Sequence, residues 1–374
     1  MKFDSFSFHS QINSGISAAG YSTPTPIQER AIPPILEGRD VLGLAQTGTG
    51  KTAAFVLPIL QRLLDGPRGR LRVLIVSPTR ELAEQTHTAI GTLARQTRLR
   101  SISVYGGVNA QAQIKGLRAG VEIVVACPGR LLDLMGQKVV NLGSVETLVL
   151  DEADQMFDMG FLPAIRRILA ALPKSRQTLL FSATMPAEIR ALTNEFLHHP
   201  VRVELGASRP VETVGHAVYP VEQTRKVELL LAILRQSGSG KVLVFTRTKY
   251  RARKLAAQLI KAGLPATSLQ GNLSQNQRQK AMDSFRSGRV KVLVATDIAA
   301  RGIDVSRISH VINYDMPDTA IAYTHRIGRT GRMAKRGTAL SLATQDDLPM
   351  VRTIERLLGR SLERRSLAGF DTGK

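Results

Sequence analysis

Tryptophan is absent from this sequence of 374 residues, cysteine occurs once, and aromatic residues make up only 5% of the chain. A single cysteine, Cys127, can form neither an internal disulfide nor a metal site that needs several cysteines. So few aromatic rings argue against a platform on which nucleic-acid bases stack. No apolar run approaches the ~18–20 residues that span a bilayer, and the start of the chain carries no signal-peptide pattern. We therefore expect a cytoplasmic protein that does not cross a membrane.

Acidic residues are also scarce, with 30 Asp and Glu against 51 Lys and Arg and a net charge of +21. The excess is concentrated in the second half: residues 1–206 carry a net charge of +5, and residues 207–374 carry +16. Such a balance indicates a polyanionic partner, and a chain with few aromatics would contact it through phosphates and sugars, with little dependence on base sequence. Charge by itself also fits an arginine-rich protein with a solvated basic face.

Short apolar runs alternate with amphipathic stretches along both halves of the chain. Runs rich in Val, Ile and Leu predict strands buried on both faces of a parallel sheet at 41–45, 73–77, 123–126, 147–150 and 178–181, and again at 241–246, 290–295, 310–314 and 337–342. Helical patterns lie between them, for example at 80–93, 162–172, 251–262 and 275–287. We predict two α/β domains, each built on a doubly wound parallel sheet.

The boundary between these domains is predicted where periodicity is lost. Residues 205–213 contain Gly and Pro and follow neither a helical nor a strand pattern. We assign residues 1–205 to the first domain, 206–215 to a linker and 216–374 to the second domain. In such folds ligands bind at the carboxyl ends of the strands, which is where the motifs below fall.

A phosphate-binding loop is predicted directly after the first strand. Glycines there let backbone amides turn towards phosphate oxygens, lysine supplies a mobile charge, and a hydroxyl can coordinate Mg²⁺. Ala45 stands where the general pattern begins with glycine, but the full spacing with Gly-Lys-Thr favours phosphate binding over an ordinary turn. The nucleotide-binding residues of this loop are Gln46, Thr47, Gly48, Thr49, Gly50, Lys51 and Thr52.

An acidic pair follows the strand at 147–150. Asp151 and Glu152 at the end of a buried strand, beside a phosphate loop, suit a metal-linked aspartate and a glutamate that activates water. Thr52 and Asp151 are therefore the predicted Mg²⁺ ligands. For Asp154 we predict polar contacts that link this loop to residues 182–184.

These motifs and several others occur in an order that resembles the DEAD-box RNA helicases of superfamily 2, from Phe3 to about Leu358. The resemblance rests on Gly-Tyr-Ser-Thr-Pro-Thr-Pro-Ile-Gln at 20–28, Pro-Thr-Arg-Glu-Leu-Ala at 78–83, Gly-Gly at 106–107, Cys-Pro-Gly-Arg at 127–130, Asp-Glu-Ala-Asp at 151–154, Val-Phe-Thr-Arg-Thr at 244–248, Ala-Thr-Asp-Ile-Ala-Ala-Arg-Gly-Ile-Asp at 295–304 and the run 323–332. It implies two tandem RecA-like domains. The run Asp-Met-Gly-Phe at 158–161 is similar to the bacterial RhlE-like subgroup.

The resemblance also implies how ATP is recognised. Gln28 would read adenine, because its amide oxygen can accept from N6 while its nitrogen donates to N7. Phe3 and Tyr21 are implied at the adenine site, and Asp304 as the acceptor of a ribose hydroxyl. Arg329 and Arg332 are implied as arginine fingers on the γ-phosphate, and a short helical turn would present both on one face.

Contacts with RNA and coupling between the two ligands are implied in the same way. The RNA-binding residues would be Pro78, Thr79, Arg80, Gly107, Pro128, Gly129, Arg130, Arg247 and Thr296, and the coupling residues Asp154, Ser182, Thr184 and His325. Cys127 departs from the family, which usually has threonine there. Since a thiol is a weaker hydrogen-bond donor than a hydroxyl, its contact with an RNA phosphate is weakened.

Together the motifs predict an RNA-dependent ATPase in which ATP and single-stranded RNA draw the two domains together and short duplexes open locally. Lys51, Asp151, Glu152, Arg329 and Arg332 are the expected catalytic residues, with ATP and Mg²⁺ bound. The alternative classes of function are a non-catalytic RNA clamp and a DNA-directed motor. Glu152 and the two arginines disfavour the clamp. The RNA target, any ribonucleoprotein or RNA-decay partner, the oligomeric state and a further basic tail are not identified by the residues.

Overall fold

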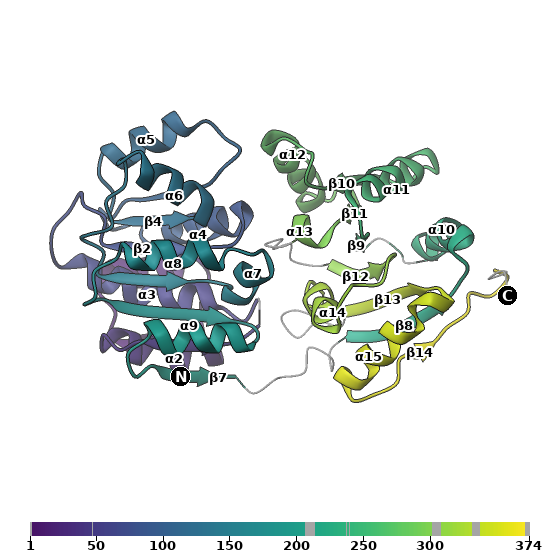
Figure 1. Cartoon of the computed structure of the whole chain (residues 1–374), viewed down its shortest axis with the longest axis horizontal. Coiled ribbons are helices and arrows are strands. Elements are labelled where there is room, and N and C mark those ends of the chain that lie inside the picture. The colour runs from purple at the N-terminus through teal and green to yellow at the C-terminus, as the bar shows by residue number, and fades with distance from the viewer. Residues whose placement is uncertain are drawn as a thin grey trace. The chain divides into compact units, whose positions relative to one another are not determined.

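Two structural units make up the chain, Met1–Gly206 and Ala207–Lys374, and each contains its own parallel sheet (Figure 1). The computed structural model describes residues 2–46, 48–205, 214–236, 238, 240–300, 308–330 and 337–370. Among them, no helix is both long enough and apolar enough to cross a membrane. The two units are described separately below.

The sheet of unit 1 consists of strands that alternate with helices along the chain. Its strands are β1 (Val41–Leu44), β2 (Val73–Val76), β3 (Ser101–Val104), β4 (Ile123–Ala126), β5 (Thr147–Leu150), β6 (Gln177–Ser182) and β7 (Val201–Glu204). They lie in the order β3-β4-β2-β5-β6-β1-β7, and neighbouring strands are parallel. All carboxyl ends therefore lie along one edge of the sheet.

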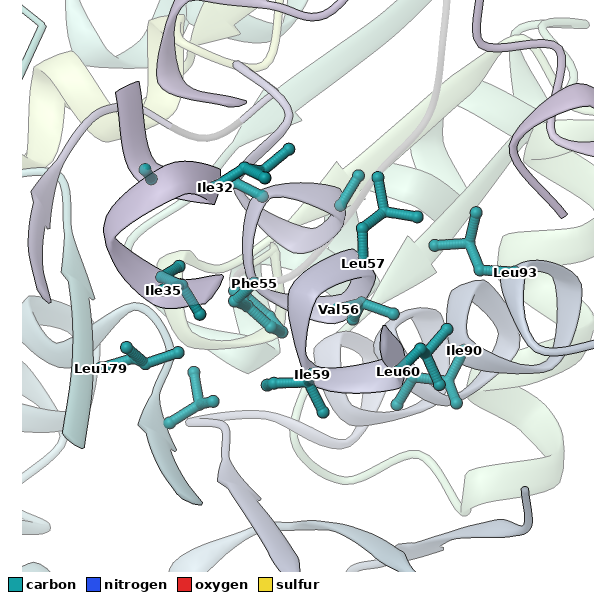
Figure 2. Packing of buried hydrophobic residues seen from close by; sticks show 14 of the residues in the cluster. Ile32, Ile35, Phe55, Val56, Leu57, Ile59, Leu60, Ile90, Leu93 and Leu179 are labelled. Carbon is teal, nitrogen blue, oxygen red and sulfur yellow. The ribbon is translucent and has the colours of Figure 1, made fainter. Parts of the chain in front are cut away.

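Helices cover both faces of this sheet. They are η1 (Phe3–Phe6), α1 (Ser10–Ala18), α2 (Pro26–Leu36), α3 (Lys51–Leu64), α4 (Arg80–Leu93), α5 (Ala110–Arg118), α6 (Pro128–Gly136), α7 (Ala153–Asp158), α8 (Leu162–Ala170) and α9 (Ala187–Phe196). Val73 and Ile75 pack against the first four α-helices, whereas Leu74 and Val76 face the others, as the period-2 geometry of a strand requires. Figure 2 shows the first layer, where Phe55 of α3 and Ile90 of α4 are buried.

Unit 2 repeats this plan. Its strands are β8 (Val214–Pro220), β9 (Lys241–Phe245), β10 (Ala266–Leu269), β11 (Val292–Ala295), β12 (Ile308–Asn313), β13 (Gly337–Ala343) and β14 (Glu363–Arg364), in the order β10-β11-β9-β12-β13-β8-β14. Its helices are η2 (Gln223–Arg225), α10 (Lys226–Gln236), α11 (Lys249–Lys261), α12 (Gln275–Arg286), α13 (Asp297–Ala300), α14 (Ala320–Ile327), η3 (Gln345–Asp347) and α15 (Leu348–Leu358). Helices α10 and α11 bury their apolar sides against one face, and α12 to α15 against the other.

The predicted architecture of two α/β domains with parallel sheets is confirmed, and the predicted helix 80–93 coincides with α4. The sequence patterns missed β3, β7, β8, β10 and β14. Strands β3 and β10 are polar and lie at sheet edges, so they lack the continuous apolar run of a central strand. The predicted linker 206–215 is too long at its end, because Val214 and Gly215 belong to β8; residues 206–213 lie outside the described residues.

Candidate nucleotide and RNA site

In unit 1 the order of the strands divides the predicted motifs into two groups. The phosphate loop, the acidic pair and the segment 182–184 follow β1, β5 and β6, which are neighbours in the sheet. The predicted RNA-binding segments follow β2, β3 and β4, which are also neighbours. One edge of the sheet therefore carries the predicted nucleotide motifs on one part, here called the nucleotide half, and the predicted RNA-binding segments on the other, here called the RNA half; the two parts meet between β5 and β2.

The phosphate loop has the backbone geometry that an anion site needs. Gly48 and Gly50 have φ angles of 87° and 96°, in the left-handed region that favours glycine, and Gly50 caps the N-terminus of α3. The Thr49 hydroxyl donates to the Gln46 carbonyl oxygen at 2.7 Å, which closes the turn. Lys51 is 5% exposed, and its ammonium has no hydrogen-bond partner within the described part of the chain. A buried cation beside a helix N-terminus fits a phosphate ligand.

Gln28 links the start of the chain to this loop. Its amide oxygen accepts from the Thr25 backbone N–H at 2.9 Å, and its amide nitrogen donates to the Gly50 carbonyl oxygen at 3.1 Å. A Cβ atom on Gly50 would lie 2.5 Å from that nitrogen, so the close approach requires glycine. A glutamine amide has two donor hydrogens and two acceptor lone pairs. Gln28 can therefore hold the loop and still read adenine.

The two aromatic residues predicted at the adenine site lie together. The rings of Phe3 and Tyr21 are nearly parallel, with an interplanar angle of 20° and centroids 6.3 Å apart. Phe3 is only 5% exposed and also packs edge-on against Phe6, whereas Tyr21 is 40% exposed. Tyr21 thus offers the more accessible ring.

The acidic pair is buried. Asp151 is 2% exposed, and burial raises its pKa to about 7; the Lys51 ammonium opposes this rise and the Glu152 carboxylate adds to it. Glu152 has φ 52° and ψ 53°, a left-handed conformation that costs a non-glycine residue on the order of 1–3 kcal/mol. Its carboxylate accepts a hydrogen bond from the Gln155 side chain. The strained backbone and Gln155 orient Glu152 in a way that the sequence patterns did not reveal.

Asp154 makes the contacts that its position predicts. One carboxylate oxygen accepts from the Ala183 N–H at 3.1 Å, the Thr184 N–H at 2.9 Å and the Thr184 hydroxyl at 3.0 Å. The Ser182 hydroxyl accepts from the Asp154 N–H at 3.3 Å and donates to the Thr184 carbonyl at 2.7 Å. The loop after β5 and the end of β6 are therefore one hydrogen-bonded assembly.

On the RNA half, Arg80 lies across the backbone of Gly107. A Cβ atom at Gly107 would approach a guanidinium nitrogen of Arg80 to 2.2 Å, and φ at Gly107 is 79°. Thr79 caps α4, because its hydroxyl accepts from the Leu82 N–H at 3.3 Å. Since Thr79 and Pro78 are buried, the accessible features here are the Arg80 side chain and the N-terminus of α4, both of which attract phosphate.

The segment after β4 offers a second helix N-terminus. Pro128 begins α6 and is buried, so it positions Gly129 and Arg130. Arg130 donates to the Val108 carbonyl at 3.4 Å and pairs with Asp133 at 3.5 Å, while its third nitrogen has no hydrogen-bond partner among the described residues. Burial raises the pKa of the Cys127 thiol to about 12, so it stays neutral at physiological pH.

In unit 2, Arg247 follows β9 and Thr296 follows β11, two neighbouring strands. Asp315 organises this edge: its carboxylate accepts from the Arg247 N–H at 2.9 Å and pairs with Arg251 at 2.6 Å. The Arg247 side chain is exposed and lies 3.5 Å from a carboxylate oxygen of Asp318.

A buried arginine joins this edge to α14. Arg326 is 2% exposed and forms a bidentate pair with Asp297 at 2.6 and 2.7 Å. It also donates to the Asn313 side chain and to the Asp315 carbonyl. Sequence reasoning missed this residue. The signal that could have indicated it was its position in the run 323–332, next to His325.

His325 lies in α14, which ends at Ile327, and Arg329 follows in a turn. Arg332 lies outside the described residues, so its predicted helical pairing with Arg329 stays a prediction. Thr47 and Asp304 also lie outside the described residues.

Two family models cover most of the chain. Residues 25–192 match the model described as DEAD/DEAH box helicase, and residues 225–334 match the helicase conserved C-terminal domain. The chain is 45% identical over 346 residues to the RNA helicase CrhR of Synechocystis sp., covering 92% of this chain and 70% of that protein. It is 39% identical over 363 residues to the DEAD-box ATP-dependent RNA helicase CshA of Bacillus subtilis, covering 97% and 73%.

Solved structures agree with these relatives. S. cerevisiae Dbp5 bound to RNA and ADP BeF3 has a TM-score of 0.88 and 31% identity, with 97% of this chain and 95% of that chain covered. Mss116, bound to ssRNA and UDP-BeF, also has a TM-score of 0.88, with 28% identity and coverage of 98% and 80%.

Proposed function

Because the chain belongs to the DEAD-box family of ATP-dependent RNA helicases, we propose that it couples RNA-dependent ATP hydrolysis to local unwinding or remodelling of RNA duplexes. Binding of ATP and single-stranded RNA favours closure of the two units on both ligands, and hydrolysis reverses it. The observation that carries this proposal is the strand order, which places the phosphate loop and the acidic pair on one part of a sheet edge and the predicted RNA-binding segments on the adjoining part.

The nucleotide half has the groups that ATP requires. The buried ammonium of Lys51 and the amides around Gly48 and Gly50 suit the phosphates. The chemistry of the donor set fits Mg²⁺, since Asp151 supplies a buried carboxylate oxygen and Thr52 a hydroxyl at the start of α3. Mg²⁺ held by these two residues would neutralise charge on the phosphates.

Hydrolysis itself needs an oriented water and charge stabilisation. We assign Glu152 to the water, since its carboxylate is held by Gln155 and its backbone is strained. Arg329 and Arg332 are assigned to the γ-phosphate. Gln28 and Tyr21 are assigned to adenine, with Phe3 supporting the Tyr21 ring, and Asp304 to the ribose.

Coupling between the ligands is assigned to the Asp154 assembly. It begins next to the catalytic carboxylates and ends at residues 182–184, so movement of one loop changes the other. In unit 2, the Arg326 network gives α14 a rigid link to Asp315 and thus to Arg247. His325 adjoins this network.

RNA binding is assigned to phosphate contacts at the helix N-termini and to the basic side chains. Arg80, which lies across Gly107, supplies charge together with Arg130 and Arg247, and the open backbone at Gly129 allows close approach of a strand. Such phosphate contacts tolerate any base sequence. We further propose membership of the bacterial RhlE-like subgroup, a cytoplasmic location, a first domain at 1–205 and a second domain that includes β8 from Val214 onwards.

The test compares ATP hydrolysis with and without single-stranded RNA and with single-stranded DNA. We expect stimulation by RNA and little by DNA. Lys51→Ala should weaken nucleotide binding, whereas Glu152→Gln should bind ATP, hydrolyse it slowly and retain RNA. Equal stimulation by DNA would contradict the RNA assignment, and full turnover by Glu152→Gln would remove that residue from its role.

A further inference from the structure

One exposed aromatic side chain in unit 2 takes no part in the proposed RNA contacts. Tyr250 lies in the first turn of α11 and is 71% exposed, the highest value among the exposed large apolar side chains of the described residues. Burial of an aromatic ring is favourable, so an exposed one on a rigid helix is a site where a ligand can add contact area.

The surface around Tyr250 is basic. Helix α11 contains no acidic residue, and its exposed face combines Tyr250 with Arg253, Lys254 and Lys261 around the small Ala257. The three basic side chains form no ion pair within the described ranges of the chain. From Tyr250 to Lys261 this face extends ~16 Å at the helical rise. Positive charge along such a length suits a nucleic-acid strand.

A lysine held by a neighbouring loop lies beside the ring. Lys249 donates to the Asn272 side chain at 3.0 Å, in the loop after β10, and its ammonium lies 5.3 Å from the centroid of the Tyr250 ring. Arg251 points away into the pair with Asp315. The ring therefore has a cation beside it and is otherwise largely exposed to solvent. Figure 1 shows α11 beside β10 in unit 2.

This face continues from the proposed RNA contact in unit 2. Arg247 lies three residues before Tyr250, at the carboxyl end of β9, and Thr248 caps α11 between them. A strand held at Arg247 passes close to the first turn of α11. The proposed phosphate contact, the exposed Tyr250 ring and the three basic side chains of α11 thus follow one another along one surface.

We propose that the exposed face of α11 binds a segment of single-stranded RNA that extends beyond the phosphate contact at Arg247, with Tyr250 stacking on a base and Arg253, Lys254 and Lys261 holding phosphates. This inference rests on the proposed function, since it takes RNA as the ligand. It adds a base contact to binding that otherwise relies on the RNA backbone. Because every base has a π-face, the contact increases affinity without selecting a sequence.

The first experiment measures the affinity of the full chain, in the presence of AMP-PNP, for a short oligoadenylate and for one about 10 nucleotides longer. Tyr250→Ala should weaken binding of the longer RNA by about 5-fold or more, the range for one stacked base, and leave the short RNA unchanged. Tyr250→Phe keeps the ring and should bind as the wild type does. Leu357→Ala, which removes an exposed side chain from α15, is the matched control.

A second experiment separates stacking from charge. Replacing the bases of the additional segment by abasic sites should weaken binding to the wild-type chain and have no effect on Tyr250→Ala. Lys254→Ala should flatten the salt dependence for the longer RNA by about 0.7 per phosphate lost. Arg352→Ala, which removes an exposed arginine of α15, should leave this slope unchanged.

The outcomes distinguish this proposal from the proposed function. If short RNA stimulates ATP hydrolysis but Tyr250→Ala binds long and short RNA as the wild type does, the α11 site is wrong and the helicase assignment stands. If abasic sites change the affinity of the wild-type chain and of Tyr250→Ala equally, the stacking contact is likewise wrong. If no RNA stimulates the wild-type chain, the proposed function itself fails.

Discussion

Replacement of Asp154 tests whether the two loops of unit 1 act as one assembly. In Asp154→Ala, two backbone N–H groups and one hydroxyl at residues 183–184 lose their acceptor. An unsatisfied buried donor costs about 1–3 kcal/mol. Ala183 and Thr184 are half-buried, so water replaces part of the loss. We expect the local free energy of opening to fall by about 2–4 kcal/mol.

Hydrogen exchange measures this change at the amides concerned. The Ala183 and Thr184 N–H groups should exchange on the order of 30–1000 times faster in Asp154→Ala, because a tenfold change in an equilibrium corresponds to about 1.4 kcal/mol. Glu195→Gln removes an exposed carboxylate that pairs with Arg166 at 3.2 Å and should cost no more than about 1 kcal/mol. Its exchange at residues 183–184 should match the wild type.

The functional consequence is a loss of coupling. With Lys51 and Glu152 intact, Asp154→Ala should still hydrolyse ATP, but each hydrolysed ATP should separate fewer RNA strands. The assay records hydrolysis and strand separation in the same reaction. Unchanged exchange together with an unchanged ratio of the two activities would refute the view that Asp154 joins the catalytic loop to residues 182–184.

Four other substitutions or reactions test separate parts of the site. Gln28→Ala should reduce the preference for ATP over GTP by about one to two decades, measured as a ratio of dissociation constants, and an unchanged ratio would move adenine recognition elsewhere. Gly107→Ala should displace the Arg80 guanidinium and weaken RNA binding, yet add little in an Arg80→Ala background; additive losses would mean that the glycine acts independently. Because burial raises the Cys127 pKa to about 12, its thiol should react with alkylating reagents far more slowly near neutral pH in the folded chain than after denaturation, and equal rates would contradict this. Arg329→Ala should slow hydrolysis by up to ~10³–10⁵-fold with nucleotide affinity little changed, whereas near-normal turnover would make it a surface residue.

The chemical motifs of the site could be predicted from the sequence because each depends on residues that are close together in the chain. The phosphate loop needs glycines and a lysine within eight positions, and the Asp-Glu pair needs only an apolar strand before it. Buried central strands such as 73–77 and the amphipathic helix 80–93 were likewise predicted, since period and composition are local properties. Edge strands such as Ser101–Val104 were missed because an edge is defined by neighbours rather than by sequence.

The tertiary structure determined which strands, and therefore which motifs, are neighbours. Strands β2 and β5 are neighbours although about 70 residues separate them, and this order places the RNA half next to the nucleotide half. The folded structure also sets the left-handed backbone of Glu152, the position of Arg80 over Gly107 and the exposure of Tyr250. None of these features follows from the residue types in a short stretch of sequence. A local sequence pattern does not specify how distant residues are arranged in space. The sequence alone could therefore predict the chemical groups of the site but not their arrangement.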